Sequence, residues 1–130
     1  MFIIDRSDHS SQLFQDMARF IEDYLKDPSL GLAMVADRFS MTPQYVSTFF
    51  KKHSGNNLTE FIAKKRIDQA KLLMQNKDLT IVQIAQITGY MSDVVFIRAF
   101  KKIEGITPGK YRVSMLSMES KTDNKMKGNS

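Results

Sequence analysis

The sequence predicts an all-α fold of seven helices, and three observations support this prediction. Apolar residues recur every three or four positions along most of the 130 residues, which is the spacing of one helix face. No stretch alternates apolar and polar residues over the length of a strand. Residues typical of helix starts and stops bound the apolar segments. The expected helices span 11–26, 32–39, 43–54, 58–75, 81–88, 93–104 and 108–116.

The first helix is expected from its apolar spacing, and the later helices from their starts. The apolar residues of 11–26 are Leu13, Met17, Phe20, Ile21, Tyr24 and Leu25. Hydroxyl and amide side chains that cap helix N-termini precede the later segments. They are Thr42 and Thr107, each before a proline, Ser92, and the capping-box pairs Asn57 with Glu60 and Thr80 with Gln83. Gly55 and Gly105 are expected to end helices.

A segment of about fifty residues occurs twice. FKKHSG at 50–55 returns as FKKIEG at 100–105. Apolar and small residues before it match at an offset of 49, and Val46 and Phe61 match Phe96 and Tyr111 at an offset of 50. The change of offset falls at the turn TGYMS, where an additional residue costs little. Each copy is a short helix, a turn and a longer helix, which is the layout of a helix-turn-helix.

A helical wheel divides each longer helix into two faces. The expected core faces carry Val46, Phe49, Phe50 and His53 in the first copy, and Phe96, Ala99, Phe100 and Ile103 in the second. The opposite faces carry Gln44, Ser47, Thr48 and Lys51, and Val94, Ile97, Arg98 and Lys101. Lysines near a helix C-terminus are favoured by the helix dipole alone. A basic flank repeated at matching positions favours a polyanionic partner instead.

Composition narrows the functional classes. The net charge is +5, and residues 31–120 alone carry +6, which favours nucleic acid or an anionic surface. No apolar run reaches the length of a membrane span, and the N-terminus lacks a signal-peptide pattern, so we expect a cytoplasmic protein. The absence of cysteine excludes disulfides and thiolate metal sites. His9 and His53 belong to no catalytic, phosphate-loop or metal-ligand pattern, so no enzyme, cofactor or metal site is expected.

The repeated segments resemble a known family. LAMVADRFSMTPQYVSTFFKKHSGNNLTEFI, followed by IAQITGYMSDVVFIRAFKKIEGITPGKYR, is similar to the DNA-binding domain of AraC/XylS-type transcription regulators. The resemblance covers about residues 16–113, and its most specific part lies in the second half. It implies helix-turn-helix subdomains at 11–57 and 77–116, joined by a linker helix at 58–76. Residues 1–10 are expected to be loose, and the polar segment 117–130 to be disordered.

The resemblance also implies a function and the residues that perform it. The expected function is sequence-specific DNA binding in transcription regulation, with recognition helices that start at Thr42-Pro43 and Ser92-Asp93 and enter successive major grooves of an asymmetric site. The base-reading positions fall on Gln44, Ser47, Thr48, Val94, Ile97 and Arg98. The phosphate contacts fall on Lys51, Lys52, Lys101 and Lys102. Arginine can pair with guanine in two hydrogen bonds, whereas phosphate contacts carry no sequence information.

Some positions depart from the family pattern or allow two interpretations. Val94, Val95 and Ile97 stand where the family is usually more polar. Either they contact thymine methyl groups, or Val95 belongs to the core and Ile97 packs against the last helix or a missing domain. Asp93 would repel phosphate, so it is expected to serve the helix start. The basic linker residues Lys64, Lys65, Arg66 and Lys71 contact DNA or, as we favour, form a solvated face, with Arg66 a candidate buried structural residue.

Double-stranded DNA is the expected partner, with RNA polymerase as a second one if the protein is an activator. No membrane partner is expected, the chain is expected to be monomeric, and the location is the nucleoid. The family commonly places a sensory or receiver domain before this region, so the chain is either a stand-alone regulator or the C-terminal part of a longer one. The alternative function is a helical protein-interaction module without DNA binding.

Overall fold

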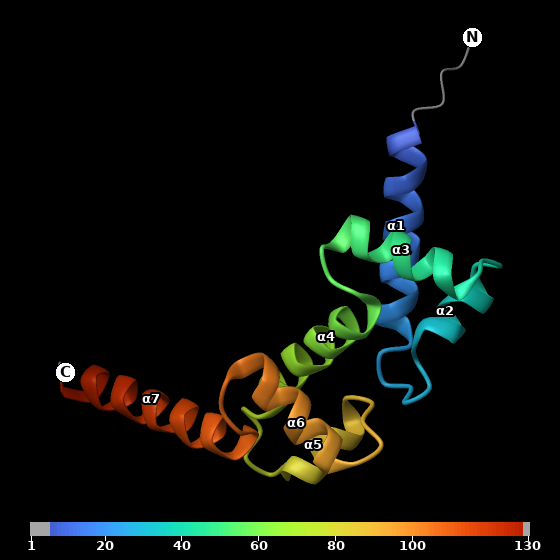
Figure 1. The fold of residues 1–130 in the computed structure, drawn as a ribbon. Helices are drawn as coiled ribbons and strands as arrows, with labels where there is room; N and C mark the ends of the chain where they lie inside the picture. The colour runs from blue at the N-terminus through green and yellow to red at the C-terminus, as the bar shows by residue number, and fades with distance from the viewer. Residues whose placement is uncertain (1–5, 129–130) are drawn as a thin grey trace. The chain divides into compact units, whose positions relative to one another are not determined.

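Helices make up the regular structure of the chain. The computed structural model describes the backbone of residues 6–128 and the side chains of residues 9–118. The helices of this part are α1 (Arg6–Asp23), α2 (Leu32–Arg38), α3 (Pro43–Ser54), α4 (Leu58–Leu73), α5 (Ile81–Ile87), α6 (Asp93–Glu104) and α7 (Pro108–Gly128) (Figure 1). The described residues thus form seven helices and no strand, which confirms the all-α prediction.

The helices belong to two compact units, whose boundary lies between Asp68 and Gln69. The first unit contains α1, α2, α3 and the beginning of α4. The second contains the end of α4 with α5, α6 and α7. The helix predicted over 58–75 ends at Leu73, and the unit boundary lies inside it. The segment expected to be a separate linker therefore contributes to both units.

The core of the first unit forms where α2 and α3 pack on each other and on α1. Its buried residues are Met17, Ile21, Leu25, Leu30, Val35, Ala36, Val46, Phe49, Phe50, Leu58 and Ile62. The Phe50 ring centroid lies 5.2 Å from that of Phe14 and 4.8 Å from that of Phe61. Phe50 therefore joins α3 to α1 and α4 and holds the opposite side of α3 outward.

The core of the second unit has the same plan, with α5 packed on α6 and α6 in contact with α7. Its buried residues include Ala70, Met74, Ile84, Ala85, Tyr90, Phe96 and Phe100. The Phe100 ring centroid lies 5.8 Å from that of Phe96 and 5.4 Å from that of Tyr111. The repeated phenylalanine thus points inward in both units, as the helical wheel predicted.

The first and last helices differ most from the sequence prediction. α1 begins at Arg6 and ends at Asp23, where 11–26 was expected, so residues 6–10 are helical and 1–5 lie outside the described residues. α7 continues to Gly128, so the expected end at 116 and the expected disordered tail were wrong as far as residue 128. Apolar spacing marks only the turns of a helix that pack against something. Polar turns at the end of a helix leave no such pattern.

Candidate nucleic-acid interface

The starts of α3 and α6 are fixed by side-chain caps. The Thr42 Oγ1 accepts a hydrogen bond from the Tyr45 N–H at 3.1 Å, and Pro43 is the first residue of α3. The Ser92 Oγ accepts one from the Val95 N–H at 3.2 Å. These caps satisfy backbone donors that a helix start leaves free. Both predicted helix starts are therefore confirmed as starts.

The ends of α3 and α6 are also alike. Gly55 and Gly105 lie in the left-handed region, with φ of 81° and 84°. The N–H of each glycine donates to the carbonyl of the lysine four residues before it, at 2.9 Å for Lys51 and 2.8 Å for Lys101. A residue with a β-carbon is strained at such φ values, which explains why both copies end in glycine.

The turns that precede α3 and α6 share an unusual backbone conformation. Ser40 has φ 54° and Gly89 has φ 102°. In each unit the next N–H donates to the alanine carbonyl of the preceding helix, in the pairs Met41 to Ala36 and Tyr90 to Ala85, both at 2.9 Å. The turn thus folds back on the small residue of the short helix in both units. Up to this point the two units correspond at an offset of 49.

Met91 is the additional residue of the second unit. The caps Thr42 and Ser92 stand 50 residues apart, so the change of offset falls between Tyr90 and Ser92. Met91 has no counterpart in the first unit, and its side chain is 85% exposed. Met41, in contrast, packs against the core of the first unit.

The outward face of α3 is polar. Gln44, Thr48 and Lys51 are exposed, and Ser47 is half-buried. Tyr45 is 51% exposed, with its ring centroid 6.0 Å from that of Phe49. The three base-reading positions predicted for this unit thus lie on one helix side that also carries a lysine.

The outward face of α6 combines apolar and basic residues. Arg98 is exposed, and Val94 and Val95 are 54% and 52% exposed. Ile97 is half-buried. The interpretation that placed Val95 in the core was wrong, because Phe96 and Phe100 supply the buried side of this helix and Val95 projects at its edge. The apolar residues of this face therefore require another explanation.

The lysines at the ends of α3 and α6 are available to a partner. Lys51, Lys52, Lys101 and Lys102 are all exposed, and none has an ion-pair partner among the described residues. Glu104, the nearest carboxylate in the second unit's sequence, is paired instead with the Lys71 ammonium at 2.9 Å. Asp93 is half-buried in the first turn of α6, where a carboxylate is favoured by the helix dipole.

The basic residues of α4 divide into surface and structural groups. Lys64 is exposed and donates to the Asn56 Oδ1 at 3.3 Å, and Lys65 lies 3.8 Å from a Glu22 carboxylate oxygen. Arg66 is only 8% exposed. Its Nε donates to the Leu25 carbonyl at 2.9 Å and its Nη2 to the Asp27 carbonyl at 2.8 Å. Arg66 is therefore the buried structural arginine that the sequence suggested.

An equivalent arginine in the second unit escaped the sequence analysis. Arg112 of α7 donates from Nε to the Met74 carbonyl at 3.3 Å and from Nη2 to the Asn76 carbonyl at 2.6 Å. Each arginine thus binds two backbone carbonyls that are two residues apart and follow the end of an earlier helix, which is α1 for Arg66 and α4 for Arg112. The two arginines stand 46 residues apart, whereas the repeat has an offset of 49 or 50 residues. The difference is about one helical turn, so an alignment of the two copies at a fixed offset does not pair them.

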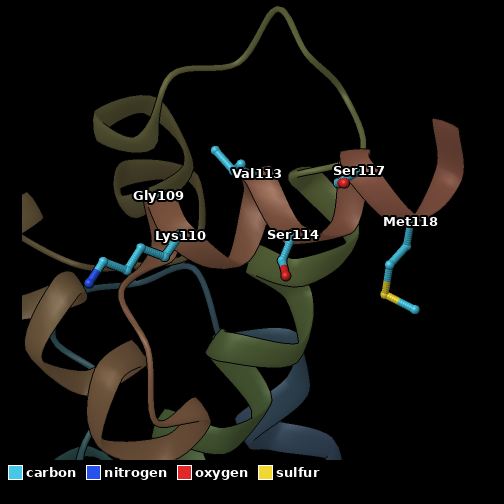
Figure 2. A pocket seen from close by; sticks show the side chains of 6 residues that line it. All are labelled: Gly109, Lys110, Val113, Ser114, Ser117 and Met118. Atoms are coloured by element: carbon cyan, nitrogen blue, oxygen red, sulfur yellow. The ribbon is translucent and has the colours of Figure 1, made fainter. Parts of the chain in front are cut away.

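The described residues bear on three other kinds of site: a metal centre, a membrane span and a ligand pocket. No group of three or more His, Cys, Asp or Glu side chains there could hold a metal ion. Nor is any helix of residues 6–128 long and apolar enough to cross a membrane. A surface depression along α7 is lined by Gly109, Lys110, Val113, Ser114, Ser117 and Met118. Figure 2 shows their side chains leaving this one helix in different directions, so they do not enclose a ligand.

Comparison with known proteins identifies the family. Residues 35–114 match a family described as "Helix-turn-helix domain", of the AraC type. This chain belongs to the AraC/XylS family. It is 38% identical over 92 residues to YtdP, an HTH-type transcriptional regulator of Bacillus subtilis, and 29% identical over 114 residues to the arabinose operon regulatory protein of Salmonella typhimurium. These matches cover 71% and 86% of this chain. The chain spans 12% and 41% of the two relatives' own lengths.

Solved structures share the AraC/XylS fold. The C-terminal domain of the response regulator yesN from Fusobacterium nucleatum has 31% sequence identity and a TM-score of 0.72, with 80% of this chain and 98% of that chain covered. The DNA-binding domain of AdpA, solved in complex with a target DNA, has a TM-score of 0.75 at 19% identity and covers 81% of this chain and 94% of that chain. At 19% identity, the similarity to AdpA shows a shared fold only. Together they support the helix-turn-helix interpretation of the two units.

Proposed function

We propose that this AraC/XylS domain is a sequence-specific DNA-binding transcription regulator in which α3 and α6 are the recognition helices. The observation that carries the proposal is the repeated outward surface: each helix has a cap at its start, a reading face and two unpaired lysines at its end. Solvation alone does not require the same flank to be basic in both units. Binding to a polyanion with a regular backbone explains a basic flank in both units, because each unit then meets phosphates in the same way.

The proposed roles follow from side-chain chemistry. Lys51, Lys52, Lys101 and Lys102 contact phosphates and position the protein. The backbone N–H groups that the caps at the starts of α3 and α6 do not bind are suited to further phosphate contacts. Gln44 pairs with adenine, Ser47 and Thr48 reach either kind of base, and Arg98 pairs with guanine through O6 and N7. Ile97 and Val94 offer only apolar contact, and Asp93 serves the helix start.

The proposed site is asymmetric. A single polypeptide with two different recognition helices reads two neighbouring major-groove segments, about 34 Å or one helical turn apart. Its site then spans on the order of twenty base pairs, and no symmetric dimer is needed. We further propose that this segment is monomeric, has no catalytic activity, and acts at the nucleoid in the cytoplasm. RNA polymerase is the proposed partner of an activator, and a sensory or receiver domain is the proposed regulatory partner in longer proteins of this family.

Binding-site selection from genomic DNA, followed by a salt titration on the selected duplex, tests the proposal. We expect one enriched asymmetric sequence and a linear fall of log affinity with log salt concentration. If each of the four lysines neutralises one phosphate, the slope is about −3.6, at about −0.9 per phosphate. A scrambled duplex is the control, and it should keep a salt dependence but lose most of the affinity.

The alternative of a protein-interaction module predicts a different result. An apolar interface responds little to salt, and the selection would enrich no sequence. That outcome would overturn the proposed function. The exposed Val94 and Val95 are the observations that favour this alternative.

A further inference from the structure

The start of α6 presents an apolar surface to solvent. Met91, Val94 and Val95 are 85%, 54% and 52% exposed and lie within five consecutive residues. The Ser92 cap and the inward-facing Phe96 fix the backbone between them. Single exposed apolar residues are common on proteins, whereas grouped ones more often mark a surface that binds a partner.

The corresponding surface of α3 is different in chemistry and alike in backbone. Gln44 takes the place of Val94, Tyr45 takes the place of Val95, and no residue takes the place of Met91. The caps, the turns and the C-terminal glycines of the two helices correspond. The two recognition helices are therefore built alike and differ in the groups they offer to a partner. The first offers hydrogen bonds where the second offers methyl and methylene groups.

The neighbours of the apolar surface favour DNA over a protein partner. Arg98 lies one turn after Val94 on the same side of α6, and Lys101 follows. All three are exposed, and Glu104 is occupied by Lys71. Protein–protein interface cores are depleted in lysine. In the major groove, the thymine C5-methyl is the apolar group that a valine can contact beside phosphates and guanine.

We propose that α6 recognises thymine through its methyl group, with Val94 in contact with the methyl and Met91 and Val95 bordering it. This inference rests on the proposed function and names the specificity of its second unit. The half of the site read by α6 then contains a thymine close to the guanine bound by Arg98. The half read by α3 is recognised by hydrogen bonds instead.

Replacing thymine by deoxyuridine tests this directly, because the replacement removes only the C5-methyl group. Each thymine of the selected duplex is replaced singly, and affinity for the 130-residue chain is measured by fluorescence anisotropy at one salt concentration. We expect about a fourfold loss at one or two thymines, which corresponds to one buried methyl group. In Val94→Ala the same replacements should have little effect, because the side chain that contacts the methyl has been removed.

Gln44→Ala is the matched control, since Gln44 occupies the same position in α3. It should weaken binding yet keep the deoxyuridine effect at the same thymines. Replacing cytosine by 5-methylcytosine at neighbouring positions gives a second measurement, because a new methyl group within reach of Val94 should raise affinity for the wild type alone. Circular dichroism of both variants checks that they are folded.

The outcomes separate this inference from the proposed function. If the wild-type chain selects no sequence, the proposed function fails and this inference fails with it. If it selects a site but no thymine shows a methyl effect that depends on Val94, DNA binding stands and methyl recognition is overturned. If Val94→Ala instead abolishes self-association or binding to a protein while leaving DNA affinity intact, the apolar surface is a protein interface and the inference is equally overturned.

Discussion

The two helix-turn-helix units are alike where the fold requires it and differ where a partner would be read. Phe50 and Phe100 occupy matching core positions, and Gly55 and Gly105 end their helices with φ values three degrees apart, 81° and 84°. On the outward faces Gln44 and Thr48 correspond to Val94 and Arg98. A repeated fold with two different faces suits the asymmetric site proposed above, because each unit would read its own segment while both would hold phosphate through corresponding lysines.

The buried arginines extend this comparison. Arg66 and Arg112 each bind two backbone carbonyls at a helix end, yet they come from different turns of their own helices. The first is 8% exposed and the second is half-buried. The bidentate guanidinium can satisfy two carbonyls that a helix C-terminus leaves free. The two units therefore share this contact, although the arginine that makes it stands at a different position of the repeat in each unit.

The largest expected difference between the units concerns these arginines. Arg66→Met should lower the stability of the first unit by about 3 kcal/mol, since one buried and one partly buried carbonyl lose charged hydrogen bonds. Arg112→Met should lower the stability of the second unit by about half as much, because water reaches its carbonyls more easily. Hydrogen exchange of backbone amides within each unit measures the two effects separately. Arg66→Lys is the matched control, and it should recover little, because an ammonium lacks the planar fork. Equal losses in both units would contradict the burial argument.

The next expected difference concerns specificity. Arg98→Ala should remove about 1–3 kcal/mol of discrimination at one base pair, and Thr48→Ala, at the matching position of α3, should remove about 1 kcal/mol or less because a neutral hydroxyl makes the weaker bond. Competition between the selected site and its single-base variants measures both. An unchanged ranking of site variants after Arg98→Ala would refute its role as a base reader. Retained affinity for scrambled duplex shows that the variants are still folded.

The smallest expected effects should be equal in the two units. Lys51→Ala and Lys101→Ala should each weaken binding to all sequences alike and reduce the salt slope by about 0.9, because each removes one phosphate contact. Salt titrations of the selected and scrambled duplexes measure this. Lys77, an exposed lysine between α4 and α5, provides a control substitution with a smaller expected change in slope. A loss confined to one base position would show that the lysine reads sequence.

Much of the fold could be predicted because its signals are local. The bounds of α3 and α6 agree with the sequence prediction, since Thr42, Pro43, Ser92 and the two glycines act through hydrogen bonds and φ values within one turn. The start of α1 and the end of α7 could not be predicted, because polar helical turns carry no apolar spacing. The assignment of individual bases and phosphates to side chains remains a prediction.

By itself the sequence determined the helices, the repeat, the inward Phe50 and Phe100 and the outward lysines, because helical periodicity and capping are short-range. Only the tertiary structure decided that Met91 is the additional residue, that Val95 faces solvent, and that Arg66 and Arg112 perform the same task. The shared task of the two arginines depends on contacts between segments distant in the chain: the Arg66 guanidinium meets a carbonyl 41 residues away, and that of Arg112 one 38 residues away. Such contacts are fixed by packing, which no local pattern encodes.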